Sequence, residues 1–308
     1  MGTLGTAVQY RKPFPPVRWR VERPKKNMTI AAGFHFNGGL LFCVDTKVST
    51  DIKTNESKLI YYTYADGECA TAFAMSSDDL NFPRSACESC RDAVSKIDFS
   101  SASIESVRKA IQSALTKFYK EHIFPHPDRS ANTIYLKFLI GIWLKGETRM
   151  FISHETVLNQ VDDYECIGSG AYLAKYWIRQ YQRANPSPLT VEDASLLASF
   201  AVKSAIDYDE YCGGEAELLI VKNSGEVDTS CETLLYPGIS FIESLQQEAW
   251  KLLHDLAHVK SDRESETAYM LERYFDKVRE IQDSYKWAFE IFNAKKNKSD
   301  TLGNTNND

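Results

Sequence analysis

Residues 29–45 read Thr29-Ile-Ala-Ala-Gly-Phe-His-Phe-Asn-Gly-Gly-Leu-Leu-Phe-Cys-Val-Asp45. Two apolar runs, residues 29–36 and 40–45, flank Asn37-Gly38-Gly39, and an Asn-Gly step between apolar runs is a strong β-hairpin signal. We therefore expect ordered structure to begin at Thr29 with a hairpin. The stretch opens on a hydroxyl side chain, Thr29, and closes on a carboxylate, Asp45.

The segment before this hairpin differs from the rest of the chain. Seven basic side chains and one acidic give residues 1–27 a net charge of +6, and with −6 for the whole chain the remainder carries −12. The segment also holds four prolines and no apolar periodicity. We expect residues 1–28 to be a disordered leader, a propeptide or the result of a start assigned too early. The acidic body argues against nucleic acid as a partner.

The composition is ordinary for a globular protein, with 43% hydrophobic and 25% charged residues. No apolar run approaches the roughly 18–20 residues that span a bilayer, and the N-terminus lacks the apolar core of a secretory signal. We therefore expect no membrane partner. Seven cysteines without a regular framework favour free thiols in a reducing compartment, so a cytoplasmic location is expected.

Beyond the hairpin, the chain alternates between strand and helix patterns. Strand patterns cover residues 58–64, 69–75, 134–144, 148–154, 164–167 and 216–222, and helical patterns cover 78–97, 103–123, 171–183 and a stretch that begins with Thr190 as N-cap. These elements predict one domain over residues 29–230. They are followed by a helical extension over 231–294 and a disordered tail over 295–308.

Scattered polar residues suit one kind of chemistry when they are taken together. An N-terminal threonine nucleophile needs its own α-amine as base and fixed charges that tune that amine. Thr29 provides the hydroxyl, and Asp45 with Lys58 provides an acid–lysine pair. Thr29 can serve only if Met28 and everything before it are removed. Each piece alone has a structural reading, because a strand threonine and an ion pair are both common.

The order of elements and these residues resemble the proteasome β-type subunits, of bacterial or archaeal type, in the N-terminal nucleophile (Ntn) hydrolase superfamily. The resemblance runs from Thr29 to about residue 227. It implies an α+β fold, a four-layer αββα sandwich of two antiparallel sheets between helix layers, to which the helical extension is added. The chain departs from the family at Cys212, where the family has serine, and at Ala74-Met-Ser-Ser77, where it has glycines.

The resemblance also implies a role for each site residue. Thr29 Oγ would attack a carbonyl while its α-amine takes the proton, Lys58 would lower the pKa of that amine, and Asp45 would hold Lys58. By the same resemblance, Ser169 and Asp209 would orient the amine, with Cys212 as a lesser contributor. The backbone near Ser76 or Ser77 would donate to the oxyanion, and the turns would be shaped by Gly168, Gly170 and Gly213.

The implied activity is that of a threonine-type peptidase that cleaves polypeptides through an acyl-enzyme. The implied assembly is a homo-oligomeric ring, with an ATP-driven unfoldase as a candidate partner. Two alternatives stay open, because a fold does not set a substrate: an amidase acting on a small-molecule amide, and a non-catalytic ring or scaffold subunit. We expect no cofactor or metal, since Cys87-x-x-Cys90 has no second pair at zinc-site spacing.

Overall fold

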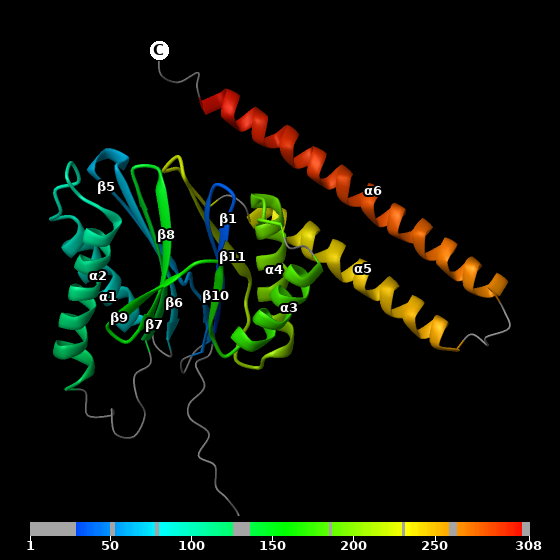
Figure 1. The fold of residues 1–308 in the computed structure, drawn as a ribbon, viewed down its shortest axis with the longest axis horizontal. Helices are drawn as coiled ribbons and strands as arrows, with labels where there is room; N and C mark the ends of the chain where they lie inside the picture. The colour runs from blue at the N-terminus through cyan, green and yellow to red at the C-terminus, as the bar shows by residue number, and fades with distance from the viewer. Residues whose placement is uncertain are drawn as a thin grey trace, which may run out of the picture.

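The computed structural model describes residues 29–49, 53–77, 80–125, 136–184, 187–229, 232–258 and 264–303. The expected leader, residues 1–28, lies outside these ranges, as do residues 304–308. Two five-stranded sheets form the centre of the protein (Figure 1). All strand pairs in both sheets are antiparallel.

The first sheet has the strand order β10-β1-β2-β11-β12 and the second has the order β5-β6-β7-β8-β9. The first sheet contains β1 (Ile30–Phe36), β2 (Gly39–Asp45), β10 (Tyr164–Gly168), β11 (Ala216–Lys222) and β12 (Val227–Asp228). The second contains β5 (Leu59–Tyr64), β6 (Cys69–Ser77), β7 (Leu136–Leu144), β8 (Glu147–His154) and β9 (Val157–Val161). A separate pair, β3 (Lys47–Ser49) with β4 (Lys53–Asn55), extends from the end of β2.

The predicted hairpin is confirmed by the pairing of β1 with β2. Phe36 lies opposite Gly39 and Ala31 lies opposite Val44. Gly39 has φ +157, and a Cβ there would lie 2.1 Å from the carbonyl oxygen of Val221 on β11. The turn therefore needs glycine because the neighbouring strand passes too close for a side chain.

Helices cover the outer face of each sheet, so the layers run helix, sheet, sheet, helix (Figure 1). Helices α1 (Asn81–Val94) and α2 (Ile104–Phe118), the latter extended by a π-helical turn over Tyr119–Ile123, pack on the second sheet. Helices α3 (Ala171–Ala184) and α4 (Val191–Tyr208) pack on the first sheet. The expected α+β sandwich is confirmed.

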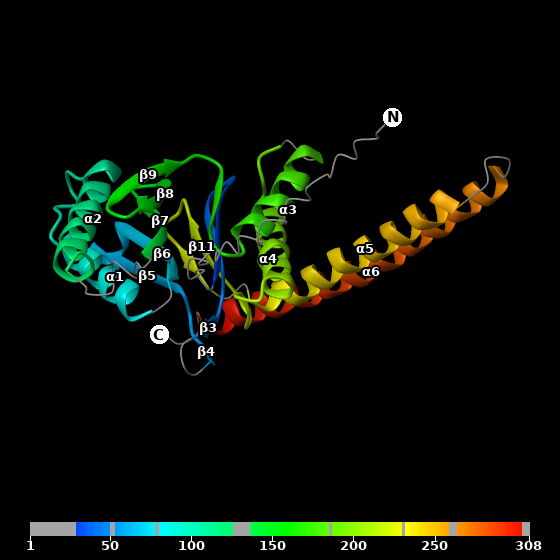
Figure 2. The same ribbon diagram turned by 90° about the horizontal axis from the view of Figure 1, so that it is seen from below.

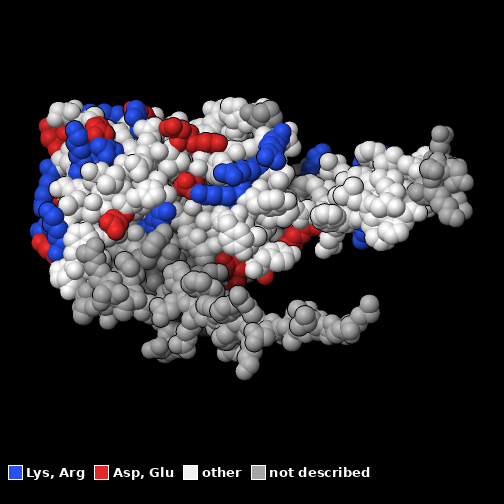
Figure 3. Space-filling view, turned by 60° about the horizontal axis from the view of Figure 1, so that its bottom comes forward, with Lys and Arg blue, Asp and Glu red and all other residues white. Residues whose placement is uncertain are grey.

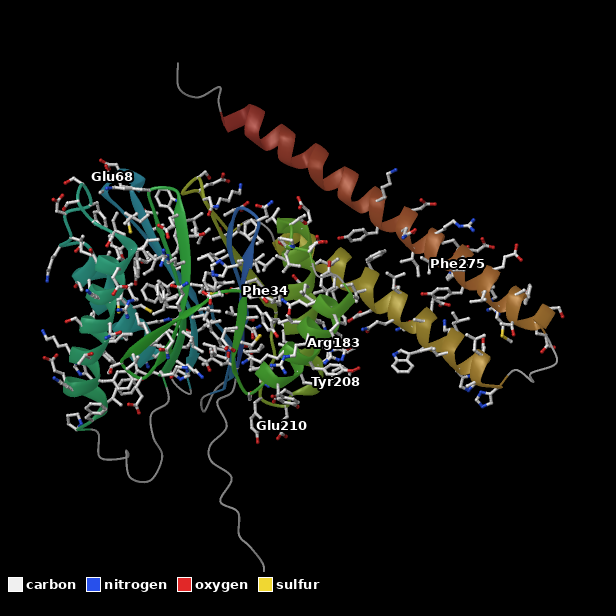
Figure 4. The ribbon with its side chains drawn as sticks, in the orientation of Figure 1. Phe34, Glu68, Arg183, Tyr208, Glu210 and Phe275 are labelled. Carbon is white, nitrogen blue, oxygen red and sulfur yellow. The ribbon has the colours of Figure 1, made fainter. Side chains whose placement is uncertain are left out.

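Alternation along the strands produces the separate cores of this sandwich. On β1, Ile30, Ala32 and Phe34 face the helices, whereas Ala31 faces the other sheet; Figure 4 labels Phe34. The sheets approach closely at Phe42, because a Cβ on Gly141 would lie 2.8 Å from its ring. Small residues on the facing strands thus set the distance between the sheets.

The C-terminal part forms two long helices, α5 (Glu232–His258) and α6 (Glu264–Gly303). Ile239 of α5 is buried in the core with α4, and beyond it α5 projects away from the sandwich. α6 returns beside α5, and its C-terminal part runs back past the start of α5 towards the sandwich (Figures 1 and 2). Residues 295–303 belong to α6, although the sequence predicts a disordered tail from residue 295. None of the described helices has the length and apolar character needed to cross a membrane.

Candidate functional site

Three of the predicted residues form a closed triangle of hydrogen bonds. Thr29 Oγ1 donates to Asp45 Oδ1 at 2.6 Å, Lys58 Nζ donates to Thr29 Oγ1 at 2.7 Å, and Lys58 Nζ donates to Asp45 Oδ1 at 2.7 Å. The threonine hydroxyl therefore lies between a carboxylate and an ammonium group, with one acceptor and one donor fixing its orientation.

The strand ends bring this triangle together from both sheets. Thr29 immediately precedes β1 and Asp45 ends β2, and the backbone N–H of Ile30 donates to Asp45 Oδ1 at 3.0 Å. Lys58 immediately precedes β5 of the second sheet, where its carbonyl accepts from Met75 N–H at 3.0 Å. The ion pair thus spans the space between the two sheets at one end of the sandwich.

The triangle is removed from solvent. Thr29 and Asp45 are 0% exposed, and Lys58 is 1% exposed. Burial lowers the pKa of the Lys58 ammonium from its usual value, and the charge and hydrogen bond of Asp45 oppose that shift. Asp45 therefore favours the charged form of Lys58, which burial alone would disfavour.

The Gly168-Ser169-Gly170 turn contacts the carbonyl oxygen of Thr29. Ser169 Oγ and Gly170 N–H both donate to that oxygen, each at 3.4 Å. Gly168 has φ +97, and a Cβ there would lie 2.1 Å from the same oxygen. The structure therefore brings Ser169 to the backbone of Thr29, and the glycine before it allows the close approach.

The turn after α4 also reaches the triangle and lies beside the Gly168-Ser169-Gly170 turn. Gly213 N–H donates to Asp45 Oδ2 at 3.1 Å, so both carboxylate oxygens are hydrogen-bonded. Cys212 Sγ lies 3.8 Å from Ser169 Oγ. Burial, followed by the charge of Asp45, raises the pKa of the Cys212 thiol to about 12. The thiol is therefore neutral near pH 7 and is at most a weak hydrogen-bond partner of Ser169.

Asp209 lies in the same turn, but its carboxylate bonds to the turn itself. Asp209 Oδ1 accepts from Tyr211 N–H at 2.9 Å, and the carbonyl of Asp209 accepts from Cys212 N–H at 3.0 Å. These contacts shape the turn that carries Cys212. The predicted role of Asp209, orienting the amine of Thr29, stays a prediction.

Ser76 and Ser77 end β6, paired with Lys137 and Leu136 of β7. Ser76 is 0% exposed, and its hydroxyl oxygen has no hydrogen-bond partner among the described residues. Alternation along β6 places Ser76 on the same face as Ala74, which packs between the two sheets. The oxyanion role assigned to the backbone here stays a prediction.

Lys47 is a residue of this site that the sequence analysis did not identify. Its Nζ donates to the carbonyls of Glu210 at 3.0 Å and Cys212 at 3.1 Å, and its backbone N–H donates to the carbonyl of Gly213 at 3.0 Å. Figure 4 labels Glu210 at this end of the sandwich. Lys47 thus holds the turn that bonds to Asp45. Its position two residues after Asp45 was the only signal for it in the sequence.

The other motifs singled out in the sequence lie away from this site. Cys87 and Cys90 are buried in α1, where Cys87 Sγ contacts Met75 Sδ at 3.9 Å and Cys90 Sγ contacts the carbonyl of Ile111 at 3.9 Å. His254 and His258 stack on each other at the exposed end of α5, with ring centroids 4.4 Å apart. The described residues contain no group of side chains that could hold a metal ion.

Comparison with known proteins finds similarity in structure alone. The chain matches no protein-family model and no curated protein. Similar solved structures are Anbu from Hyphomicrobium sp. strain MC1 (TM-score 0.57, 15% identity, 76% of this chain and 99% of that chain) and Anbu, described as an ancestral beta-subunit, from Yersinia bercovieri (TM-score 0.57, 15% identity, 76% and 99%). A third is the Anbu complex of Pseudomonas aeruginosa, described as a helical assembly (TM-score 0.56, 15% identity, 76% and 98%).

These neighbours correct the family suggested by the sequence. The assignment to the proteasome β-type subunits was wrong, because the similar structures are Anbu proteins, which are proteasome-like but form a distinct family. The motifs behind the assignment mark strand ends and turns of a fold, and more than one family can share a fold. At 15% identity the comparison shows a proteasome-like fold for this chain.

Proposed function

We propose that this chain is a threonine-type amide hydrolase in which Thr29, once it is the first residue, attacks peptide bonds. The observation that carries the proposal is the buried triangle of Thr29, Asp45 and Lys58, in which the hydroxyl lies 2.6 Å from a carboxylate oxygen and 2.7 Å from an ammonium nitrogen. A buried structural threonine needs only one hydrogen-bond partner, whereas a hydroxyl held between a carboxylate and an ammonium group is suited to activation.

In the proposed mechanism, the free α-amine of Thr29 takes the proton of Oγ as Oγ attacks the carbonyl carbon. Lys58 stabilises the negative charge that develops on Oγ through its hydrogen bond, and Asp45 keeps Lys58 in place. The tetrahedral intermediate expels the leaving amine, which takes the proton back from the α-ammonium group. Water then attacks the resulting ester, with the amine again as base, and releases the acid.

The surrounding residues have supporting roles in this proposal. Ser169 holds the carbonyl of Thr29, Asp209 shapes the turn whose Gly213 bonds to Asp45, and backbone N–H groups at the end of β6 stabilise the oxyanion. Polypeptides are the proposed substrates, and the chain is proposed to act as an oligomer in the cytoplasm. The oligomer is supported by a neighbouring structure described as a helical assembly, and the cytoplasmic location by the free cysteines among the described residues.

A second candidate is a non-catalytic subunit of such an assembly. One observation favours it: in the full chain the nitrogen of Thr29 is joined to Met28 in a peptide bond, so it cannot act as an amine base. The two candidates differ in the N-terminus of the native protein. Intact mass and N-terminal sequencing are expected to find Thr29 as the first residue of the hydrolase.

The catalytic test compares Thr29→Ala with Thr71→Ala, a buried threonine of β6 that bonds to Tyr64 instead. Thr29→Ala is expected to abolish cleavage of an unfolded protein and labelling by threonine-directed electrophiles, whereas Thr71→Ala keeps both. Cleavage of a small amide but not of unfolded protein would favour an amidase. Activity in a preparation that retains residues 1–28 would refute the threonine mechanism, and retention without activity would favour the non-catalytic subunit.

A further inference from the structure

The helical hairpin α5–α6 has no core of its own beyond its junction with the sandwich. Among the described side chains of residues 240–258 and 265–286, each is at least partly exposed and none is buried. Two helices can bury only one stripe against each other, so a stable helical unit needs a further layer. The sandwich does not supply that layer along α5 and the first half of α6, because this part of the hairpin points away from it (Figures 1 and 2).

A groove lined by both apolar and charged side chains runs along one face of the hairpin between its helices. Towards the tip, a hollow of about 1050 Å³ is lined by Trp250, Leu252, Met270 and Tyr274, among others. A second hollow of about 340 Å³ continues it towards the sandwich, where the rings of Phe241 and Tyr285 stack 4.4 Å apart. Both hollows are lined by Lys277 and Glu280, so they share one face.

We propose that this groove binds the same groove of a second copy of the chain, so that two α5–α6 hairpins form a four-helix bundle. The lining runs along α5 from Ser240 to Asp255, about 24 Å at 1.5 Å per residue, and two helices side by side are about 20 Å wide. The face therefore offers about 500 Å² per copy. Pairing buries about 1,000 Å² in total, the lower bound for a specific interface.

The charges of the groove favour a second copy over a strongly charged partner. The lining of the larger hollow contains three basic and four acidic side chains. Two pairs neutralise each other within the chain, Lys251 with Glu248 at 2.6 Å and Lys277 with Glu280 at 2.6 Å. Most of the hairpin surface visible in Figure 3 is also uncharged. A face of mixed and nearly balanced charge can meet its own copy across a two-fold axis without net repulsion.

The test compares variants with a negative charge introduced in the groove with variants that carry the same charge outside it. Trp250 and Tyr269 line it and are 69% and 66% exposed. Leu253 and Phe275 lie outside the lining and are 56% and 55% exposed; Figure 4 labels Phe275. Changing any of the four to glutamate alters an exposed side chain, so the folded hairpin is expected to survive. Circular dichroism checks that the helix content is unchanged.

Sedimentation velocity over a range of concentrations measures the assembly of the full chain. We expect Trp250→Glu and Tyr269→Glu each to raise the dissociation constant of the pairing at least tenfold and to halve the molar mass of the assembled species. Leu253→Glu and Phe275→Glu should assemble as the wild type does. Equal masses for the wild type and the groove variants, or equal losses in all four variants, would overturn the proposal. The measurement needs no activity, so it is independent of the proposed hydrolase function.

Discussion

Replacing Lys58 by methionine tests whether Lys58 and Asp45 form a coupled, buried ion pair within the triangle. Methionine keeps most of the length and apolar character of the lysine stem but removes the ammonium group. Asp45 then remains buried as a carboxylate without its cation. The expected result is a large loss of stability together with loss of any Thr29-dependent activity, because the hydroxyl of Thr29 loses its donor at 2.7 Å.

The size of the loss follows from burial and from the bonds that remain. The side chains of Lys58 and Asp45 are 2% and 0% exposed. Removing one partner of a buried pair costs about 3–5 kcal/mol. Asp45 keeps three donors, the hydroxyl of Thr29 and the N–H groups of Ile30 and Gly213, so the lower end, about 3 kcal/mol, applies. At about 2–4 °C per kcal/mol, Tm should fall by about 6–12 °C.

The matched control is Lys222→Met, which removes an exposed ion pair of equal length. Lys222 and Glu226 are 2.7 Å apart but 33% and 58% exposed, and such pairs contribute about 0.5 kcal/mol. Thermal and urea unfolding of both variants measure the difference. Adding Asp45→Asn to Lys58→Met should restore part of the stability, because it removes the unpaired charge. If Lys58→Met costs no more than Lys222→Met, the account of a buried, coupled pair is wrong.

Three further predictions follow from neighbouring features. Gly168→Ala should lower the free energy of unfolding by more than about 3 kcal/mol, and Gly67→Ala by only about 1 kcal/mol, although both glycines have positive φ (+97 and +94). The new Cβ would meet the carbonyl oxygen of Thr29 at position 168, whereas it would meet nothing within 4 Å at position 67. Equal losses of stability in urea unfolding would contradict this reasoning. Ser76→Ala should leave stability unchanged or raise it by about 1 kcal/mol, whereas Ser153→Ala, whose hydroxyl accepts from Phe138 N–H at 2.8 Å, should cost about 1–3 kcal/mol. The free energy of unfolding should fall above about pH 9, because burial raises the pKa of six buried thiols and the unfolded chain therefore loses those protons first. Each thiol contributes about 1.4 kcal/mol per pH unit, and the opposite pKa shift at Lys58 concerns a single group. A constant Tm from pH 8 to 10 would refute the prediction.

Elements with strong local signals were predictable from the sequence. Asn37-Gly38 indicated the hairpin, and Ser103 and Thr190 indicated helix starts, where each side chain now accepts a hydrogen bond from the backbone three residues on. The strands that were missed are short or polar. Lys53–Asn55 lacks apolar residues, and Val157–Val161 is an edge strand with two exposed polar residues, so its pairing depends on β8 rather than on its own pattern.

The candidate site divides in the same way. Thr29, Asp45 and Lys58 were predicted because their residue types suit one chemistry at strand ends, and the structure brings them within 2.7 Å of one another. The contacts of Asp209 and Lys47 depend on backbone groups of a turn, which a list of side chains does not contain. Asp209 Oδ1 accepts from the N–H two residues on, as aspartate commonly does in turns, and the role expected for Asp209 stays a prediction.

The contacts of Thr29 separate the geometry of the site from its activation. Within the described part of the chain, its hydroxyl bonds to Asp45 and Lys58 and its carbonyl accepts from Ser169 and Gly170, but none of these bonds uses its nitrogen. The nucleophile is therefore held by groups that do not depend on a free N-terminus. Cleavage after Met28 would supply the amine base without rearranging the triangle. Under the proposed function, the chain carries an assembled site whose missing component is the free α-amine that acts as base, and hydrolysis of one peptide bond provides it.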